Sequence, residues 1–250
     1  MGVAARLAFA MLALQFAIGT ANDMVDVSAD RIGHPLKPIP SGRLTADFAR
    51  VVFAVCAVAG LTLAASVRFE ALVVGAIGLS DGLFYDLRLK GTPWSWVPFA
   101  AGVALLPVFS WLGAVGTLPR AFLGILPMAL LAGAMLATTN ALADQEGDRA
   151  AGARSIATEL GRNSTLMANA ALLAAIQAIA VGTTIATGGQ LAGILAEAAG
   201  IVLGWAGLGL AASSQNRLVR LAWEIQAIGV VALGAGWLAS LSSAGFLGTT

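Results

Sequence analysis

Long apolar segments alternate with shorter polar ones along this chain, and this pattern predicts its fold. A helix rises about 1.5 Å per residue, so about 20 apolar residues are needed to cross the hydrocarbon core of a bilayer. A helix also satisfies its own backbone hydrogen bonds in lipid, which a lone strand cannot do. We therefore predict an all-α, polytopic transmembrane helical bundle with eight spans. The eight apolar segments are residues 3–21, 46–65, 69–86, 95–113, 121–143, 164–186, 190–212 and 219–241.

The composition excludes several other classes of protein. Of the 250 residues, 58% are hydrophobic and 11% are charged, whereas soluble domains carry about 25% charged residues. This rules out a single soluble domain and a disordered chain. The lone cysteine, Cys56, has no partner for an intrachain disulfide. A net charge of +1 gives no basic field for nucleic acid, and we expect no nucleic-acid partner.

Lysine and arginine residues are distributed unevenly between the two sets of connecting segments. One set, which includes the long polar loops 22–45 and 144–163, holds 11 of them. The opposite set holds Arg6, Arg68 and Arg120. Because positive residues favour the inner side, we place both long loops in the cytoplasm and both chain ends outside. We expect an integral protein of a prokaryotic cell (inner) membrane.

A specific polar motif occurs twice, each time after an apolar segment. Asn22, Asp26 and Asp30 follow the first segment, and Asn140, Asp144 and Asp148 follow the fifth. Both copies read N-x-x-x-D-x-x-x-D-R and lie 118 residues apart. Each copy closes the first span of a four-span unit, so both are predicted to emerge on the same side. We therefore predict one domain, 1–250, with parallel repeats at about 1–118 and 119–250 around a central cavity.

The spacing of the motif predicts its chemistry. On a helix, positions i, i+4 and i+8 share one face, so each motif forms a column of oxygen donors. Four carboxylates that converge at a membrane surface repel one another. Mg²⁺ relieves this repulsion, because it takes oxygen ligands and shares them with substrate phosphates. Solvated acidic loops are the simpler explanation for a single Asp-x-x-x-Asp, but not for a duplicated pattern.

The two motifs resemble the aspartate-rich motifs of the UbiA superfamily of intramembrane prenyltransferases. The stretch NDMVDVSADRIGHPLKPIPSGRL is similar to the first, and DQEGDRAAGARSIATELGR to the second. The resemblance implies nine transmembrane helices around a cavity, with Mg²⁺ holding the diphosphate of an isoprenoid donor. It implies transfer of the prenyl group to a lipophilic acceptor within the membrane. The metal-binding residues it implies are Asn22, Asp26, Asp30, Asn140, Asp144 and Asp148.

Basic residues near the motifs are the candidates for binding the diphosphate. Three of them, Arg31, Lys37 and Arg154, fall where the family often has basic residues. Two more lie in Tyr85-Asp-Leu-Arg-Leu-Lys90, which resembles the family's Tyr…Lys segment, and these two compete for one role. The candidates are Arg31, Lys37, Arg43, Arg88, Lys90, Arg149 and Arg154.

The chain departs from the family at its beginning. The family has two helices before the first motif, and here one is predicted. An outside amino terminus also calls for a further helix upstream of Met1. A late start codon, a fragment and a reduced variant all fit, and we favour the first two.

Asp81 and Tyr85 are the catalytic candidates outside the motifs. Asp81 lies within the third apolar segment, where a carboxylate is costly and usually faces a cavity. It could position an acceptor hydroxyl or take its proton. The equally weighted alternative is a hydrogen bond to a neighbouring helix or a position near the membrane interface. Tyr85, one turn later, could shield an allylic cation from water. Core packing is the equally weighted alternative for this side chain.

Other functions remain open from the sequence. A cation transporter or channel with an acidic cytoplasmic vestibule is the main alternative, although basic loops beside the motifs favour an anionic ligand. A phosphoalcohol transferase that uses cytidine nucleotides is disfavoured, because Asp81-Gly82 is not followed by the Ala-Arg that it requires. An inactive truncated chain that only folds or associates is the third alternative. The sequence indicates no protein partner and does not identify the acceptor.

Overall fold

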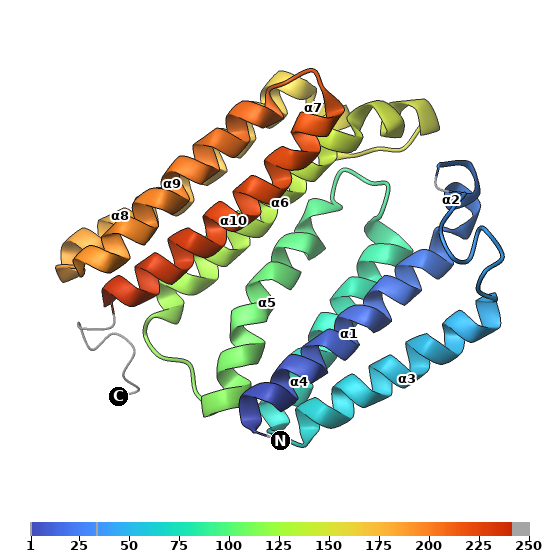
Figure 1. The fold of residues 1–250 in the computed structure, drawn as a ribbon, viewed down its shortest axis with the longest axis horizontal. Helices are drawn as coiled ribbons and strands as arrows, with labels where there is room; N and C mark the ends of the chain where they lie inside the picture. The colour runs from blue at the N-terminus through green and yellow to red at the C-terminus, as the bar shows by residue number, and fades with distance from the viewer. Residues whose placement is uncertain (1, 34, 242–250) are drawn as a thin grey trace. The chain divides into compact units, whose positions relative to one another are not determined.

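The computed structural model describes residues 2–33 and 35–241, except for the side chain of Ala151 (Figure 1). All regular elements in these residues are helices, which confirms the all-α fold class. One long helix lies over each predicted apolar segment. The long helices are α1 (Val3–Val25), α3 (Ala46–Ala65), α4 (Phe69–Phe84), α5 (Trp96–Val115), α6 (Phe122–Ala151), α8 (Arg162–Thr187), α9 (Leu191–Ala211) and α10 (Asn216–Leu241). The shorter elements are α2 (Val27–Gly33), the π-helix η1 (Tyr85–Leu89) and α7 (Ile156–Leu160).

Seven of the long helices have the length and composition of a membrane span. The remaining one, α4, has only 16 residues. It continues directly into η1, and the Tyr85 N–H donates to the carbonyls of Asp81 and Gly82. The polytopic helical architecture is therefore confirmed, whereas the number of eight spans stays a prediction.

Two helices extend beyond the predicted apolar segments, and each extension carries part of a motif. The first segment was expected to end at residue 21, but α1 continues to Val25. The fifth was expected to end at residue 143, but α6 continues to Ala151. Hydropathy marks only the part of a helix that lies in lipid, so it misses polar turns that extend past the membrane.

The chain divides into two compact units, each of which is described by itself. Unit 1 comprises Met1–Lys90 and Leu105–Thr117, and unit 2 comprises Gly91–Ala104 and Leu118–Thr250. Helix α5 contributes to both units and contains Pro107, whose missing N–H interrupts the helical hydrogen bonds near the division. One boundary lies beside the predicted repeat boundary. The internal repeat itself stays a prediction.

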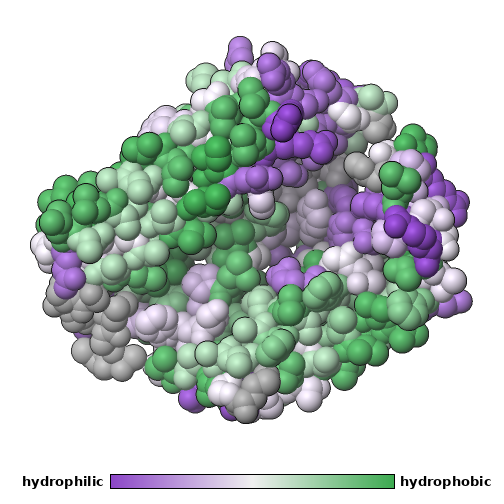
Figure 2. Space-filling model, viewed as in Figure 1, coloured by the Kyte–Doolittle hydropathy of each residue, from purple (hydrophilic) through white to green (hydrophobic). Residues whose placement is uncertain are grey.

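Small residues allow the helices of unit 1 to pack closely. Phe109 and Leu14 are almost fully buried against alanines from several helices. Gly82 on α4 leaves room for Ile18 on α1, since a Cβ atom on Gly82 would lie 2.8 Å from Ile18 side-chain atoms. On the face shown in Figure 2, hydrophobic residues cover most of the helical surface, and hydrophilic residues gather over α2 with the loop after it and around α7.

Unit 2 uses the same principle for its helix pair α9 and α10. A Cβ atom on Gly200 would lie 2.5 Å from the Leu233 nitrogen, and one on Gly236 would lie 2.5 Å from the Glu197 nitrogen. Such close backbone contact is typical of helix pairs in membranes, where packing rather than water drives association. Glu197 is buried and accepts hydrogen bonds from Thr184 at 2.6 Å and from Ser240.

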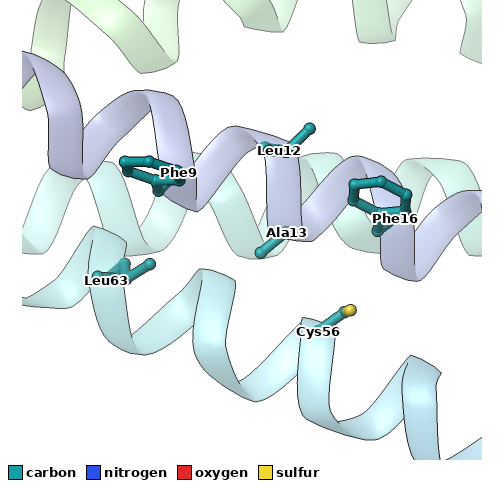
Figure 3. Close-up of a pocket in the computed structure, with 6 residues that line it drawn as sticks. All are labelled: Phe9, Leu12, Ala13, Phe16, Cys56 and Leu63. Atoms are coloured by element: carbon teal, nitrogen blue, oxygen red, sulfur yellow. The ribbon is translucent and has the colours of Figure 1, made fainter.

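An apolar cleft lies between α1 and α3 in unit 1 (Figure 3). Phe9, Ala13 and Phe16 line it from α1, and Cys56 and Leu63 line it from α3. Its walls offer almost no polar surface, and none of the candidate site residues lines it. The candidate site residues lie elsewhere, at the polar ends of the helices.

Candidate functional site

The first motif lies where α1 gives way to α2. Asp26 separates the two helices, but helical hydrogen bonding continues through it. The Asp26 N–H donates to the Asn22 carbonyl at 3.0 Å, and the Asp30 N–H donates to the Asp26 carbonyl at 2.8 Å. Each motif residue is thus one helical turn from the next, as the spacing predicts.

Two motif residues contact the π-helix η1 and the residue directly after it. Asn22 Nδ2 donates a hydrogen bond to Asp86 Oδ1 at 2.6 Å. Lys90 Nζ forms an ion pair with Asp26 Oδ2. We refer to Asn22, Asp26, Asp86 and Lys90 as the quartet. Its members come from chain segments that are far apart in sequence and are joined by side-chain contacts.

The quartet follows from the register between α1 and the segment formed by α4 and η1. Both of its contacts join residues 64 positions apart. The same offset separates Ile18 from Gly82, one turn earlier on each helix. Moving four residues at a time along both segments gives an apolar contact at Ile18, then a hydrogen bond at Asn22, and then an ion pair at Asp26.

Lys37, in the loop after α2, neutralises the rest of the first motif. Its Nζ lies 2.8 Å from Asp30 Oδ2 and 3.1 Å from Asp23 Oδ1. Asp30 is 5% exposed, so its charge is compensated largely by this lysine. Partial burial works to lower the pKa of Lys37, but the hydrogen bonds to Asp30 and Asp23 outweigh it and raise that pKa. Lys37 therefore stays charged beside the motif.

The second motif lies entirely on α6. Asn140 and Asp144 are exposed, and Asp148 is partly exposed. Asn140 Nδ2 lies 3.4 Å from Asp144 Oδ2, a long hydrogen bond within the column. The Asp148 carboxylate forms no hydrogen bond or ion pair with any other residue that the structure describes. This motif thus presents its column of oxygen atoms on one uninterrupted helix.

The segment after the second motif is fixed by backbone and side-chain contacts. The Arg154 N–H donates to the Gly91 carbonyl at 3.2 Å. Its side chain donates to Glu159 at 2.7 Å, which lowers the pKa of the Glu159 carboxyl and raises that of Arg154. Ser155 caps α7 by accepting from the Thr158 N–H. These contacts order the chain directly after α6.

The other basic candidates differ in how they are held. Arg43 donates to Ser41 Oγ at 3.0 Å and to the Leu36 carbonyl, so it stabilises the loop after α2. Three arginines are exposed and form no hydrogen bond or ion pair with another residue in the described part of the chain. These are Arg31, Arg88 and Arg149. Of the two competitors in the Tyr85 segment, Lys90 contacts a motif residue and Arg88 does not.

Asp81 and Tyr85 lie in the turns just before Asp86 and Lys90. Asp81 is partly buried, and its carboxylate makes no hydrogen bond or ion pair within residues 2–33 and 35–241. The alternative of a bond to a neighbouring helix therefore finds no support there. Tyr85 is partly buried, and its ring centre lies 6.0 Å from Lys90 Nζ. Both residues thus lie shortly before Asp86 and Lys90, which contact the first motif.

Asp86 is the site residue that the sequence analysis missed. It is only 5% exposed, and its second carboxylate oxygen, Oδ2, is buried without a hydrogen-bond partner. The available signal was its spacing, four residues before Lys90 and directly after Tyr85. Hydropathy hid that signal, because the residue stood at the predicted end of an apolar segment.

The donor set of both motifs suits Mg²⁺, which prefers carboxylate and amide oxygen ligands. A buried carboxylate oxygen without a partner beside the first motif agrees with a cation binding there. Among the described residues, no three carboxylate, histidine or cysteine side chains converge into a ready-made metal site. In unit 1 the lysine ammonium groups already compensate the motif carboxylates. The motif residues thus provide the type of ligand that Mg²⁺ prefers, and the lysines compete with the metal for the carboxylates of unit 1.

Comparison with known proteins identifies the family. A digeranylgeranylglyceryl phosphate synthase from Methanopyrus kandleri is 32% identical over 66% of this chain. The matched region spans 60% of that relative's own length. A UbiA homologue from Aeropyrum pernix has the same fold, with a TM-score of 0.79, 20% identity and coverage of 94% of this chain and 88% of its own. A UbiA homologue from Archaeoglobus fulgidus bound to GPP and Mg²⁺ matches with a TM-score of 0.71 and 17% identity, covering 93% and 87%.

The family model extends the match over most of the chain. It covers residues 2–226, which include both motifs, the Tyr85 segment and all the basic candidates. The resemblance read from the two motifs is therefore confirmed. The chain belongs to the UbiA prenyltransferase family.

Proposed function

We propose that this protein transfers a prenyl group from an isoprenoid diphosphate to a lipophilic acceptor within the membrane, in a reaction that needs Mg²⁺. The observation that carries the proposal is the quartet. It places an amide, two carboxylates and a lysine together at the end of helix α1 and just beyond helix α4, which packs against it. A cation and an anionic phosphate both find complementary groups there.

The motif residues would hold the metal. In this proposal Asn22, Asp26 and Asp30 provide oxygen ligands from unit 1, and the second motif provides its own set. The bound metal would stabilise the negative charge that develops on the leaving diphosphate. The aspartates are ligands rather than acid–base groups. The second set consists of Asn140, Asp144 and Asp148.

The basic residues would bind the diphosphate oxygens. Lys90 and Lys37 form ion pairs with motif carboxylates. Once a cation binds those carboxylates, the two lysines can bind phosphate oxygens instead. Arg31, Arg88 and Arg149, which have no such partner among the described residues, need no such exchange. We propose that the leaving group is bound by Lys37, Lys90, Arg31, Arg43, Arg88, Arg149 and Arg154.

Asp81 and Tyr85 would act on the organic part of the reaction. Ionisation of the allylic C–O bond leaves an allylic cation and a diphosphate. The Tyr85 ring can face that cation and exclude water, which would otherwise convert it to an alcohol. The Asp81 carboxylate can orient an acceptor hydroxyl and take its proton as the new C–O bond forms.

The acceptor class and the location belong to the same proposal. The relative from Methanopyrus kandleri is named as a synthase of a glyceryl phosphate lipid. We therefore propose a lipid alcohol as the acceptor. We also propose that the protein resides in a prokaryotic cell membrane with both motif loops in the cytoplasm, in line with the distribution of basic residues.

The test is a transfer assay with protein reconstituted in lipid nanodiscs. It uses a series of labelled isoprenoid diphosphates, a panel of lipid alcohol and aromatic acceptors, and Mg²⁺ with or without EDTA. We expect diphosphate release coupled to a prenylated product, lost with EDTA and restored by excess Mg²⁺. Ion flux through liposomes without any isoprenoid, together with no transfer to any acceptor, would instead support a transporter.

A further inference from the structure

Asp86 has an unusual position for a carboxylate. It lies in η1, is 5% exposed, and belongs to neither aspartate motif. Its Oδ1 accepts the hydrogen bond from Asn22 at 2.6 Å. Its Oδ2 is buried and has no partner among the described residues. Burying a carboxylate oxygen is costly unless it is hydrogen-bonded or paired with a cation. The burial of Asp86 Oδ2 therefore needs an explanation.

The hydrogen bond determines how the Asn22 amide is oriented. An amide group has a donor end and an acceptor end, and a half-turn of the side chain exchanges them. An ionised carboxylate can only accept, so the end that faces Asp86 must be the Nδ2 group. The carbonyl oxygen Oδ1 of Asn22 is therefore directed away from Asp86. It accepts no hydrogen bond from any described residue.

The helix register brings the two side chains together. Ile18 packs over Gly82, and one turn later Asn22 meets Asp86 at the same offset of 64 residues. Any residue larger than glycine at position 82 would meet Ile18. The contact is thus a consequence of how α1 and α4 pack, and not of a flexible loop.

We infer that Asp86 is a positioning residue that holds the Asn22 amide with its oxygen free to bind a metal ion. The inference rests on the proposed function, in which Asn22 is a metal ligand. Without Asp86, the amide could rotate and present its NH₂ group, which repels a cation. Removing a group that orients a metal ligand in this way commonly lowers metal affinity about 10- to 100-fold.

The test measures Mn²⁺ affinity by electron paramagnetic resonance in nanodiscs, with inorganic pyrophosphate at a fixed concentration in every sample. The variants are Asp86→Leu, Asp86→Asn, Asn22→Ala and the double variant Asn22→Ala/Asp86→Leu. Asp86→Asn keeps an oxygen that can accept from Asn22 but removes the charge. Thermal unfolding of each variant checks that it is folded. Asp47→Asn, on an exposed carboxylate of α3, is the matched control for loss of charge.

The expected pattern separates positioning from other roles. Asp86→Leu should weaken Mn²⁺ binding about 10-fold, Asp86→Asn should weaken it less, and Asp47→Asn should leave it unchanged. The double variant should bind no more weakly than Asn22→Ala, because Asp86 acts through Asn22. In transfer assays, Asp86→Leu should raise the Mg²⁺ concentration needed for half-maximal rate more than it lowers the rate at saturating Mg²⁺.

Three results would overturn the inference while leaving the proposed function intact. The first is normal Mn²⁺ binding by Asp86→Leu when Asn22→Ala binds weakly. The second is a double variant whose loss is the product of both single losses, which would make Asp86 act directly. The third is equal loss in Asp86→Asn and Asp86→Leu, which would make its role purely electrostatic. If the unmodified protein binds no Mn²⁺ and transfers no prenyl group, both proposals fail.

Discussion

The two copies of the motif have the same sequence pattern but different surroundings. In unit 1, Asn22 and Asp26 contact side chains from another part of the chain, Asp86 and Lys90. In unit 2, the column lies along a single helix, and its first two members are exposed. A spacing of four thus determines that the residues share a helical face, but not which groups lie against that face.

The difference in charge compensation has a chemical consequence. Asp26 and Asp30 are already paired with Lys90 and Lys37, so a cation must compete with two ammonium groups. Asp148 has no such partner within the described chain. We therefore expect the first motif to bind a cation well only when phosphate draws the lysines away. Substitutions in either motif and in the packing beneath it test this asymmetry.

The largest effect is expected from removing one carboxylate of either motif. Asp26→Ala and Asp144→Ala should each lower the rate of prenyl transfer roughly 10²- to 10³-fold, because each removes a proposed ligand that stabilises the leaving diphosphate. The rates are measured at saturating donor and Mg²⁺. Asp47→Asn, on an exposed carboxylate that pairs with Arg50, serves as the control and should keep its rate. Normal turnover by Asp144→Ala would restrict the metal site to unit 1.

Removing a competing lysine should produce two effects of opposite sign. Lys90→Gln should bind Mn²⁺ about fivefold more tightly in the absence of pyrophosphate, since a partly buried ion pair worth about 1 kcal/mol no longer opposes the cation. It should also slow prenyl transfer about 10-fold, because a phosphate-binding group is lost. Arg149→Gln is the matched variant in unit 2 and should not tighten Mn²⁺ binding. Weaker Mn²⁺ binding by Lys90→Gln would contradict the competition.

The helices could be predicted from the sequence because hydrophobicity alone determines where they cross lipid. A helix lies over each predicted apolar segment, and the family was evident from motif residues such as Asp26 and Asp144. The ends of α1 and α6 were predicted too early, because the motif turns are polar yet helical. Local spacing was therefore sufficient for the elements and for each column.

The partners of the columns could not be predicted, because they depend on the register between helices. Nothing in the sequence indicates that the glycine at position 82 accommodates Ile18, and this contact sets the offset that joins Asn22 to Asp86. The π-helix that carries Asp86 is likewise invisible to hydropathy. Tertiary contacts of this kind appear only when two segments are seen side by side.

The polar network under the second motif should contribute to stability rather than to turnover. Asn169 is fully buried and donates to Thr139 at 2.7 Å and to the Met135 carbonyl, and Gln226 donates to it at 2.9 Å. Asn169→Ala would leave these groups unsatisfied, so we expect a loss of about 2 kcal/mol in the free energy of unfolding. Denaturant unfolding in detergent measures this loss. Asn163→Ala, at an exposed position of the same helix, should cost little.

The smallest effect is expected from one added methyl group at the contact that sets the register in unit 1. A Cβ atom on Gly82 would lie 2.8 Å from Ile18, whose side chain can shift, so Gly82→Ala should cost about 1 kcal/mol of unfolding free energy. The same shift should loosen the contact between Asn22 and Asp86 and weaken Mn²⁺ binding a few-fold, measured with pyrophosphate present. Gly78→Ala is the control, because its added Cβ meets no atom within 4 Å. Shortening the opposing side chain, as in Ile18→Val, should restore Mn²⁺ affinity in Gly82→Ala, and failure of that rescue would mean that the register does not control the site.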